Sequence, residues 1–145
     1  MPEYNPLTSE LIEQLCTIVG DRNVIYDDEE KLEVYAKDEL PGERYAHKPE
    51  AVVKPAATEE VSAVMKLANE HHIPVTPRGA GTGLAGGAIP MYGGIVLSLE
   101  RMNHILEIDV DNLVVVTEPG VVTNEINDAA NEHGLFYAGY PMSLL

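Results

Sequence analysis

The spacing of apolar residues alternates along the chain between helical and strand-like periods, which predicts a fold that mixes helices and strands. Residues 8–19 carry apolar side chains every three to four positions, so we expect a helix with one buried face. Thr8 or Ser9 can cap its start, and Gly20 is placed to end it. Residues 21–48 show only weak periodicity and many acids, so we expect an irregular, solvated lead-in there.

A strand, a helix and a second strand follow the lead-in. Residues 51–54 form a short apolar run that predicts a strand, and residues 58–72 return to helical spacing. Thr58 is the expected cap of this helix, and Met65 is expected on its buried face. Residues 73–76 predict the next strand, and this spacing of elements is typical of a parallel crossover.

The last part of the chain predicts one more central strand, a hairpin and a helix. Residues 94–99 are strongly apolar and short, as buried strands are. Residues 104–109 and 113–118 favour strands joined through Asp111 and Asn112, which predicts a hairpin. A final helix is expected from about residue 123 to residue 134.

These elements predict an α+β fold of α/β character, with a small mixed sheet, a parallel βαβ unit and helices packed on the sheet. The length of 145 residues is enough to bury a hydrophobic core. We expect residues 1–48 to form an N-terminal helix and lead-in, and residues 49–145 to form the main subdomain.

The net charge of −15 argues against binding partners that are themselves strongly negative. A chain this acidic repels nucleic acids and anionic membrane surfaces, so we expect neither nucleic-acid binding nor membrane insertion. Cys16 is the only cysteine, so no internal disulfide can form, and it is expected to be a core thiol. The chain begins without a secretion signal and has no long apolar run, so we expect a cytoplasmic protein.

The histidines and acids show no pattern that marks a catalytic or metal site. The acids of residues 27–30 lack the spacing of metal ligands, which favours a solvated loop. His71 and His72 are adjacent at a predicted helix end, where they suit the helix dipole better than a shared metal. We assign no catalytic residue and no metal ligand.

The most informative segment is the glycine-rich stretch PRGAGTGLAGGAIP, residues 77–90, in which five of the nine residues from Gly79 to Gly87 are glycine. Residues 81–86 match the dinucleotide fingerprint G-x-G-x-x-G, but that motif must open into a helix. Here the glycines lead to Pro90 and a predicted strand, so we reject a Rossmann loop. No Lys-Ser/Thr pair follows the glycines, which also excludes a Walker loop.

Glycines free the backbone to turn successive N–H groups toward a bound anion, as in a phosphate-binding nest. Thr82 offers a hydroxyl in the same turn, and Arg78 offers a guanidinium in an otherwise acidic chain. We therefore expect this segment to bind phosphate. The alternative is a glycine-rich connection that packs tightly against another strand and binds nothing.

Several segments in order also resemble a known family. They are PEAVVKPAATEEVSAVMKLANEHHIPVTPRGAGTGLAGGAIP, GGIVLSLERMNHILEID, VVVTEPGV and HGLFYAGYPMS. This part of the chain is similar to the N-terminal part of the FAD-binding domain of FAD-linked oxidases of the vanillyl-alcohol-oxidase or PCMH type. Within that superfamily it is most similar to glycolate oxidase FAD subunits and D-lactate dehydrogenases.

The resemblance implies which residues hold FAD. The glycine segment would wrap the FAD diphosphate, a second loop at EPGV would lie against the cofactor, and YPMS would approach the flavin. The implied cofactor-binding residues are Pro77, Arg78, Gly79, Ala80, Gly81, Thr82, Gly83, Gly86, Gly87, Pro119, Gly120, Val121, Pro141 and Ser143.

Two departures from the family pattern refine this expectation. Some relatives carry a flavin-linked histidine where this chain has Thr82, so we expect noncovalent FAD. Many relatives carry an acid where this chain has Tyr140, which bears on the detailed contacts of YPMS.

The resemblance also implies that the FAD domain and a catalytic domain continue beyond Leu145, so we expect the chain to be incomplete at its C-terminus. Because part of the FAD cradle is then missing, we expect the chain by itself to bind FAD weakly at best. The implied parent enzyme oxidises a small 2-hydroxy acid and passes electrons to an acceptor, such as an iron–sulfur subunit or an electron-transfer flavoprotein. Two alternatives stay open: a flavin-independent binder of nucleotides or phosphosugars, and an interaction fragment that binds no ligand.

Overall fold

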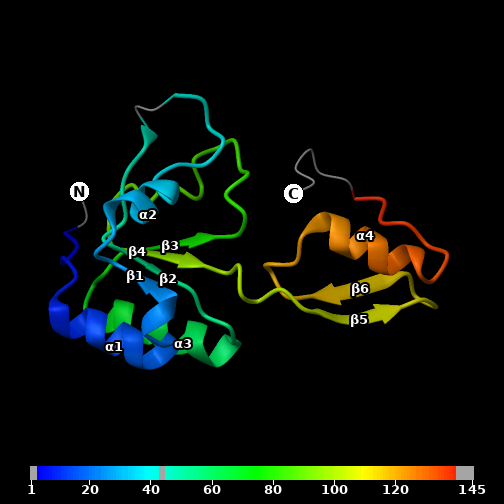
Figure 1. The fold of residues 1–145 in the computed structure, drawn as a ribbon, viewed down its shortest axis with the longest axis horizontal. Coiled ribbons are helices and arrows are strands. Elements are labelled where there is room, and N and C mark those ends of the chain that lie inside the picture. The colour runs from blue at the N-terminus through cyan, green and yellow to red at the C-terminus, as the bar shows by residue number, and fades with distance from the viewer. Residues whose placement is uncertain (1–2, 43–44, 140–145) are drawn as a thin grey trace. The chain divides into compact units, whose positions relative to one another are not determined.

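The computed structural model describes residues 3–42 and 45–139, and the chain divides into two compact units, Met1–Leu99 and Glu100–Leu145 (Figure 1). The first unit is a four-stranded sheet with helices on both faces. The second unit is a two-stranded hairpin with one helix. The predicted α+β class, with a small mixed sheet and helices packed on it, is confirmed.

The first helix forms as the sequence predicts. Helix α1 (Ser9–Val19) is capped by Thr8, whose side-chain oxygen accepts the N–H of Leu11 at 3.3 Å. Gly20 ends it with φ of +86°, a conformation that favours glycine. Cys16 packs half-buried against the hydrophobic core, and burial raises the pKa of its thiol.

The lead-in is more ordered than the sequence predicts. It contains a 3₁₀ turn η1 (Asp21–Asn23), a short strand β1 (Val24–Ile25) and a helix α2 (Glu29–Val34). The expectation of a loop across the acids of residues 27–30 is wrong, because Asp28 caps α2 by accepting the N–H of Lys31 at 3.1 Å. Acids at a helix start satisfy free N–H groups and suit the helix dipole.

The predicted crossover helix is present with two corrections. Helix α3 (Thr58–Glu70) begins at Thr58, so Ala57 occupies the cap position and no side chain caps the helix. Met65 is 44% exposed, so its predicted burial is wrong. Val64 and Ala68 form the buried contact instead, because the part of α3 that faces the sheet is narrow.

The strands of the first unit are ordered β1-β2-β4-β3. Strands β2 (Ala51–Val53), β4 (Ile95–Ser98) and β3 (Val75–Arg78) run parallel, and β1 pairs antiparallel with β2. The predicted parallel unit is confirmed, although β4 lies between the two strands that α3 connects. Strand β3 starts and ends two residues later than predicted.

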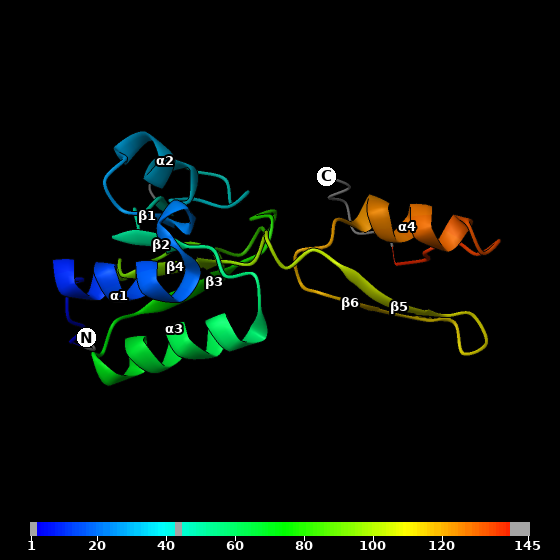
Figure 2. The ribbon, with the colours of Figure 1, turned by 60° about the horizontal axis from the view of Figure 1, so that its bottom comes forward.

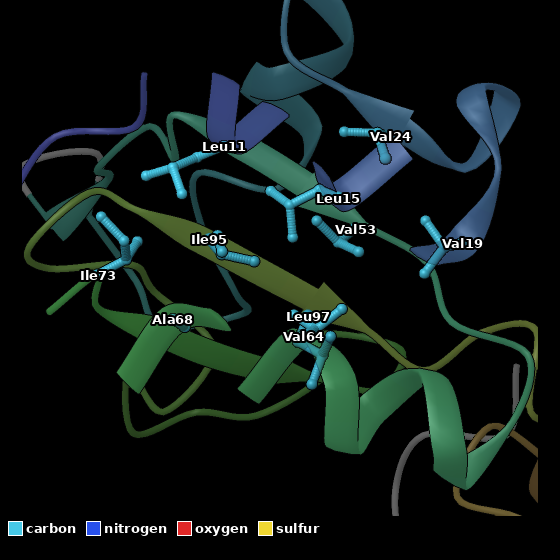
Figure 3. Close-up of a cluster of buried hydrophobic side chains, with 10 residues drawn as sticks. All are labelled: Leu11, Leu15, Val19, Val24, Val53, Val64, Ala68, Ile73, Ile95 and Leu97. Atoms are coloured by element: carbon cyan, nitrogen blue, oxygen red, sulfur yellow. The ribbon is translucent and has the colours of Figure 1, made fainter. Parts of the chain in front are cut away.

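Alternate side chains of the central strands bury on opposite faces of the sheet. Figure 2 shows α1 and α3 on one face and α2 on the other. The larger core, drawn in Figure 3, joins Leu11, Leu15, Val19, Val24, Val53, Val64, Ala68, Ile73, Ile95 and Leu97. The smaller core, on the face of α2, joins Leu32, Val52 and Val96.

The second unit confirms the predicted hairpin and helix. Strands β5 (Ile105–Asp109) and β6 (Val114–Thr117) pair antiparallel, and helix α4 (Thr123–Asn131) follows. Among residues 100–139, Met102 is the only side chain that is buried. Across both units, the described helices include none with the length and apolar character needed to cross a membrane.

Candidate functional site

The glycine segment connects the carboxyl end of β3 to the start of β4, two neighbouring parallel strands. Ligands of open parallel sheets bind at these carboxyl ends. Pro77 and Arg78 belong to β3 itself, and Pro77 is tolerated because β3 is an edge strand. No helix forms between residues 79 and 94, all of them described, which agrees with the rejection of a Rossmann loop.

Two glycines of this segment adopt conformations that other residues rarely take. Gly81 has φ of +74° and Gly86 has φ of +76°. A Cβ atom on Gly81 would also clash with the guanidinium of Arg78. The positions of Gly79 and Gly87 are different, because a Cβ atom there would have no other atom within 4 Å. The segment is therefore packed at Gly81 and open at Gly79 and Gly87.

The backbone N–H groups of residues 79–88 donate no hydrogen bond to any residue in the ranges 3–42 and 45–139. Two carbonyls of the same segment do accept hydrogen bonds: that of Gly83 from the N–H of Glu39 at 3.0 Å, and that of Gly86 from the N–H of Ile89 at 3.2 Å. A run of free N–H groups beside open space is what an anion-binding loop needs. The residues present thus fit a diphosphate.

Arg78 lies with its guanidinium against Gly81 of this loop. Its Nη1 donates to the carbonyl of Lys37 at 2.8 Å, and its guanidinium lies 5.5 Å from the ring centre of Tyr35. The ammonium of Lys54 lies 5.4 Å from the same ring. Two of the nine Lys and Arg residues of the chain thus gather at one tyrosine beside the loop. They supply local positive charge in an acidic protein.

Residues 37–40 form a wall of the loop that the sequence did not predict. Besides the contacts of Lys37 and Glu39, Leu40 lies 3.5 Å from the position of a Cβ atom on Gly86. Asp38 is 8% exposed, and its Oδ1 accepts the N–H of Leu40 at 2.9 Å. This segment has no motif, so only the folded chain brings it to the glycines.

The second predicted loop, Pro119 to Val121, follows β6 in the other unit. Gly120 donates its N–H to the carbonyl of Met102 at 2.8 Å. Glu118, just before this loop, accepts the backbone N–H of His104 at 2.8 Å and lies 2.7 Å from His104 Nδ1. These two contacts lower the pKa of the Glu118 carboxyl. Glu118 is therefore bound to its own hairpin.

The remaining predicted residues fall into three groups. Ala80 and Thr82 lie in the glycine segment with Gly79 and Gly83, so these predicted residues share one loop. Pro141 and Ser143 lie outside the described residues. Pro119, Gly120 and Val121 belong to the unit of β5 and β6.

The model of the FAD binding domain family matches residues 49–144. The chain is 40% identical over 138 residues to the glycolate oxidase subunit GlcD of Bacillus subtilis, covering 95% of this chain and 29% of that protein. It is 43% identical to a D-lactate dehydrogenase of Anaerostipes hadrus, covering 96% of this chain and 29% of that protein. The chain therefore spans less than a third of the length of these relatives.

A solved structure supports the same assignment. The structure of p-cresol methylhydroxylase with substrate bound matches 91% of this chain, with a TM-score of 0.77 and 30% sequence identity, and the match covers 27% of that chain. The predicted resemblance to PCMH-type domains is confirmed, and so is FAD as the cofactor. The chain belongs to the FAD binding domain family, with the relationship to glycolate oxidase and D-lactate dehydrogenase that its sequence predicts.

Proposed function

We propose that the chain anchors FAD through its diphosphate in an oxidoreductase that acts on small 2-hydroxy acids. The run of free N–H groups over residues 79–88 is the observation that carries the proposal. The substrate class comes from the relatives, since glycolate and D-lactate are both small 2-hydroxy acids. When bound, FAD supplies the acceptor for the electrons that leave the substrate carbon.

The residues of the chain have distinct parts in this function. Several of the amides of residues 79–88 donate to the phosphate oxygens, and the glycines keep side chains out of their way. Arg78 supplies positive charge at the base of the loop. Thr82 has no ring nitrogen that could bond to the flavin, so FAD binds noncovalently. Pro119, Gly120, Val121, Pro141 and Ser143 remain further proposed contacts of the cofactor.

The electron acceptor and the cytoplasmic location expected from the sequence belong to the same proposal. An iron–sulfur subunit or an electron-transfer flavoprotein would suit the acceptor role. Steady-state assays of the protein that carries this domain, with glycolate and D-lactate as substrates and a redox dye as acceptor, test the substrate class. Oxidation of neither acid would contradict it.

Equilibrium dialysis of the 145-residue chain against FAD, ADP and riboflavin tests the anchoring role. We expect the chain to bind FAD and ADP only weakly, because it spans less than a third of the length of its FAD-binding relatives. Riboflavin should bind more weakly still, because it has no diphosphate. The contacts of a partly exposed guanidinium are worth about 1.5 kcal/mol. Arg78→Ala should therefore weaken FAD binding about tenfold.

Arg22→Ala is the matched control, because Arg22 is an exposed arginine of the same unit, outside the loop. It removes the same charge and should leave FAD affinity nearly unchanged. Equal losses in both variants would mean that overall charge, and not Arg78, affects binding. Tight binding of riboflavin alone, or of sugar phosphates but not FAD, would contradict the anchoring role.

A further inference from the structure

Asp38 carries an unsatisfied oxygen inside the first unit. Its Oδ2 is buried and has no hydrogen-bond partner within the part of the chain that the structure describes. The other oxygen, Oδ1, is fixed by the N–H of Leu40, so the carboxylate cannot turn freely. A buried polar atom without a partner is costly, so the position of Asp38 Oδ2 calls for an explanation.

The free oxygen faces the glycine loop. A Cβ atom built on Gly83 would stand 3.6 Å from Asp38 Oδ2, which places the oxygen against the backbone of Gly83. The next residue, Glu39, donates its N–H to the Gly83 carbonyl at 3.0 Å. The N–H groups of Gly83 and Leu84 have no partner among residues 3–42 and 45–139. Asp38 Oδ2 is thus an acceptor without a donor, and it lies against Gly83, where the backbone N–H groups are donors without an acceptor.

We propose that Asp38 is a positioning residue for the diphosphate loop. When the loop closes on a diphosphate, Asp38 Oδ2 accepts a backbone N–H of the Gly83–Leu84 turn. This bond holds the turn so that the preceding amides point at the phosphates. The inference rests on the proposed function, because it concerns the loop that binds FAD.

Electrostatics alone predicts the opposite effect of removing this carboxylate. A negative charge close to a diphosphate opposes its binding, so neutralising Asp38 would strengthen FAD binding if charge were its only influence. As a hydrogen-bond acceptor for the loop, Asp38 instead strengthens binding, and its neutralisation weakens it. The sign of the change therefore separates the two roles.

Asp38→Asn is the most informative variant. The asparagine keeps the size of the side chain and the Oδ1 contact with Leu40, but it places an NH₂ donor where Oδ2 accepts. Glu39→Gln is the matched control, because Glu39 is exposed and its contact with Gly83 comes from the backbone. It removes the same charge from the next residue. Asp38→Ala removes both acceptors.

The test measures FAD affinity of the 145-residue chain by equilibrium dialysis, amide shifts by two-dimensional NMR, and thermal stability. We expect Asp38→Asn and Asp38→Ala to weaken FAD binding at least fivefold, while Glu39→Gln leaves it unchanged or slightly stronger. In the wild type, FAD should move the NMR signals of the Gly83 and Leu84 amides in the direction expected when an amide forms a hydrogen bond. In Asp38→Asn these two shifts should be lost, while those of Gly79 and Gly81 persist.

Equal or stronger FAD binding by Asp38→Asn, with wild-type binding intact, would overturn the role of Asp38 and leave the proposed function standing. If neither the wild-type chain nor the longer protein that carries this domain binds FAD or ADP, the proposed function is overturned, and this inference with it. If Asp38→Asn does not fold, Asp38→Glu serves as the second variant. It keeps the charge but displaces the acceptor, so wild-type affinity in a folded Asp38→Glu chain would also overturn the inference.

Discussion

Replacing Gly81 by alanine tests whether Arg78 and the glycine loop are built as one unit. The backbone of Gly81 is left-handed, with φ of +74°, and a Cβ atom there would clash with the Arg78 guanidinium. Gly81→Ala must therefore strain the backbone and displace Arg78 from the carbonyl of Lys37 and the ring of Tyr35. Both effects lower the stability of the first unit.

The magnitude follows from these contacts. An alanine in the left-handed region costs roughly 1–2 kcal/mol. Loss of the partly exposed hydrogen bond to Lys37 costs about 1 kcal/mol. Loss of the contact with Tyr35 costs about 0.5 kcal/mol. Gly81→Ala should therefore lower the free energy of unfolding of the first unit by about 2.5–3.5 kcal/mol.

A double-mutant cycle with Arg78→Ala isolates the coupling between the two residues. In the Arg78→Ala background no guanidinium is left to displace, so Gly81→Ala should cost only the strain of about 1–2 kcal/mol. Urea unfolding, followed by the amide signals of Val52 and Val96 in the central strands, measures each free energy. Gly79→Ala is the control, with an expected change within about 0.5 kcal/mol, since a Cβ atom there meets nothing within 4 Å. Additive effects of the Gly81 and Arg78 substitutions would refute the packing described here.

Three further predictions test other parts of the chain. Gly94→Ala should prevent folding of the first unit or destabilise it severely, as seen by circular dichroism, because a Cβ atom there would clash with the carbonyl of Pro74; a wild-type melting curve would contradict this. The hairpin should be less stable in acid, because contacts with His104 lower the pKa of Glu118. The contribution of Glu118 to hairpin stability is full above its unfolded pKa of roughly 4.3, and it disappears as the pH falls through the lowered folded pKa. Amide signals of β5 and β6 should report that loss in the wild type and show less pH dependence in Glu118→Gln. Hydrogen exchange should be slow in β2 and β4 and fast in β5, β6 and α4, because Met102 is the only buried side chain among residues 100–139; equal protection of both units would count against this.

The sequence predicted the elements whose pattern is long or strongly apolar. Helix α1 repeats its buried positions over three turns, and β4 is apolar from Ile95 to Leu97 and buried on both faces. Helix α2 was missed because it has six residues, only one of which, Leu32, is buried. The burial of Met65 was predicted wrongly because periodicity shows a face of α3 but not how much of it the sheet covers.

At the candidate site, too, the sequence predicts the parts with a local pattern and misses the contacts between distant residues. An unusual local composition marks the glycine loop in the sequence, and several motifs in order indicate its family, while its role in binding FAD stays a proposal. The sequence does not indicate Asp38, because β2, α3 and β3 separate it from Gly83 along the chain. The two residues meet only once these elements have folded. The same is true of the carbonyl of Lys37, which fixes Arg78. A contact between residues distant in sequence leaves no local pattern to read.

The central claim is that main-chain N–H groups of residues 79–88 bind the diphosphate of FAD. Two-dimensional NMR of the 145-residue chain, titrated in parallel with FAD and with riboflavin, tests it most directly. FAD should shift the amide signals of this loop in a saturable way while those of β5, β6 and α4 move less, and riboflavin should leave the loop signals in place. Loop signals that stay unmoved by saturating FAD, or that move equally with riboflavin, would contradict the claim.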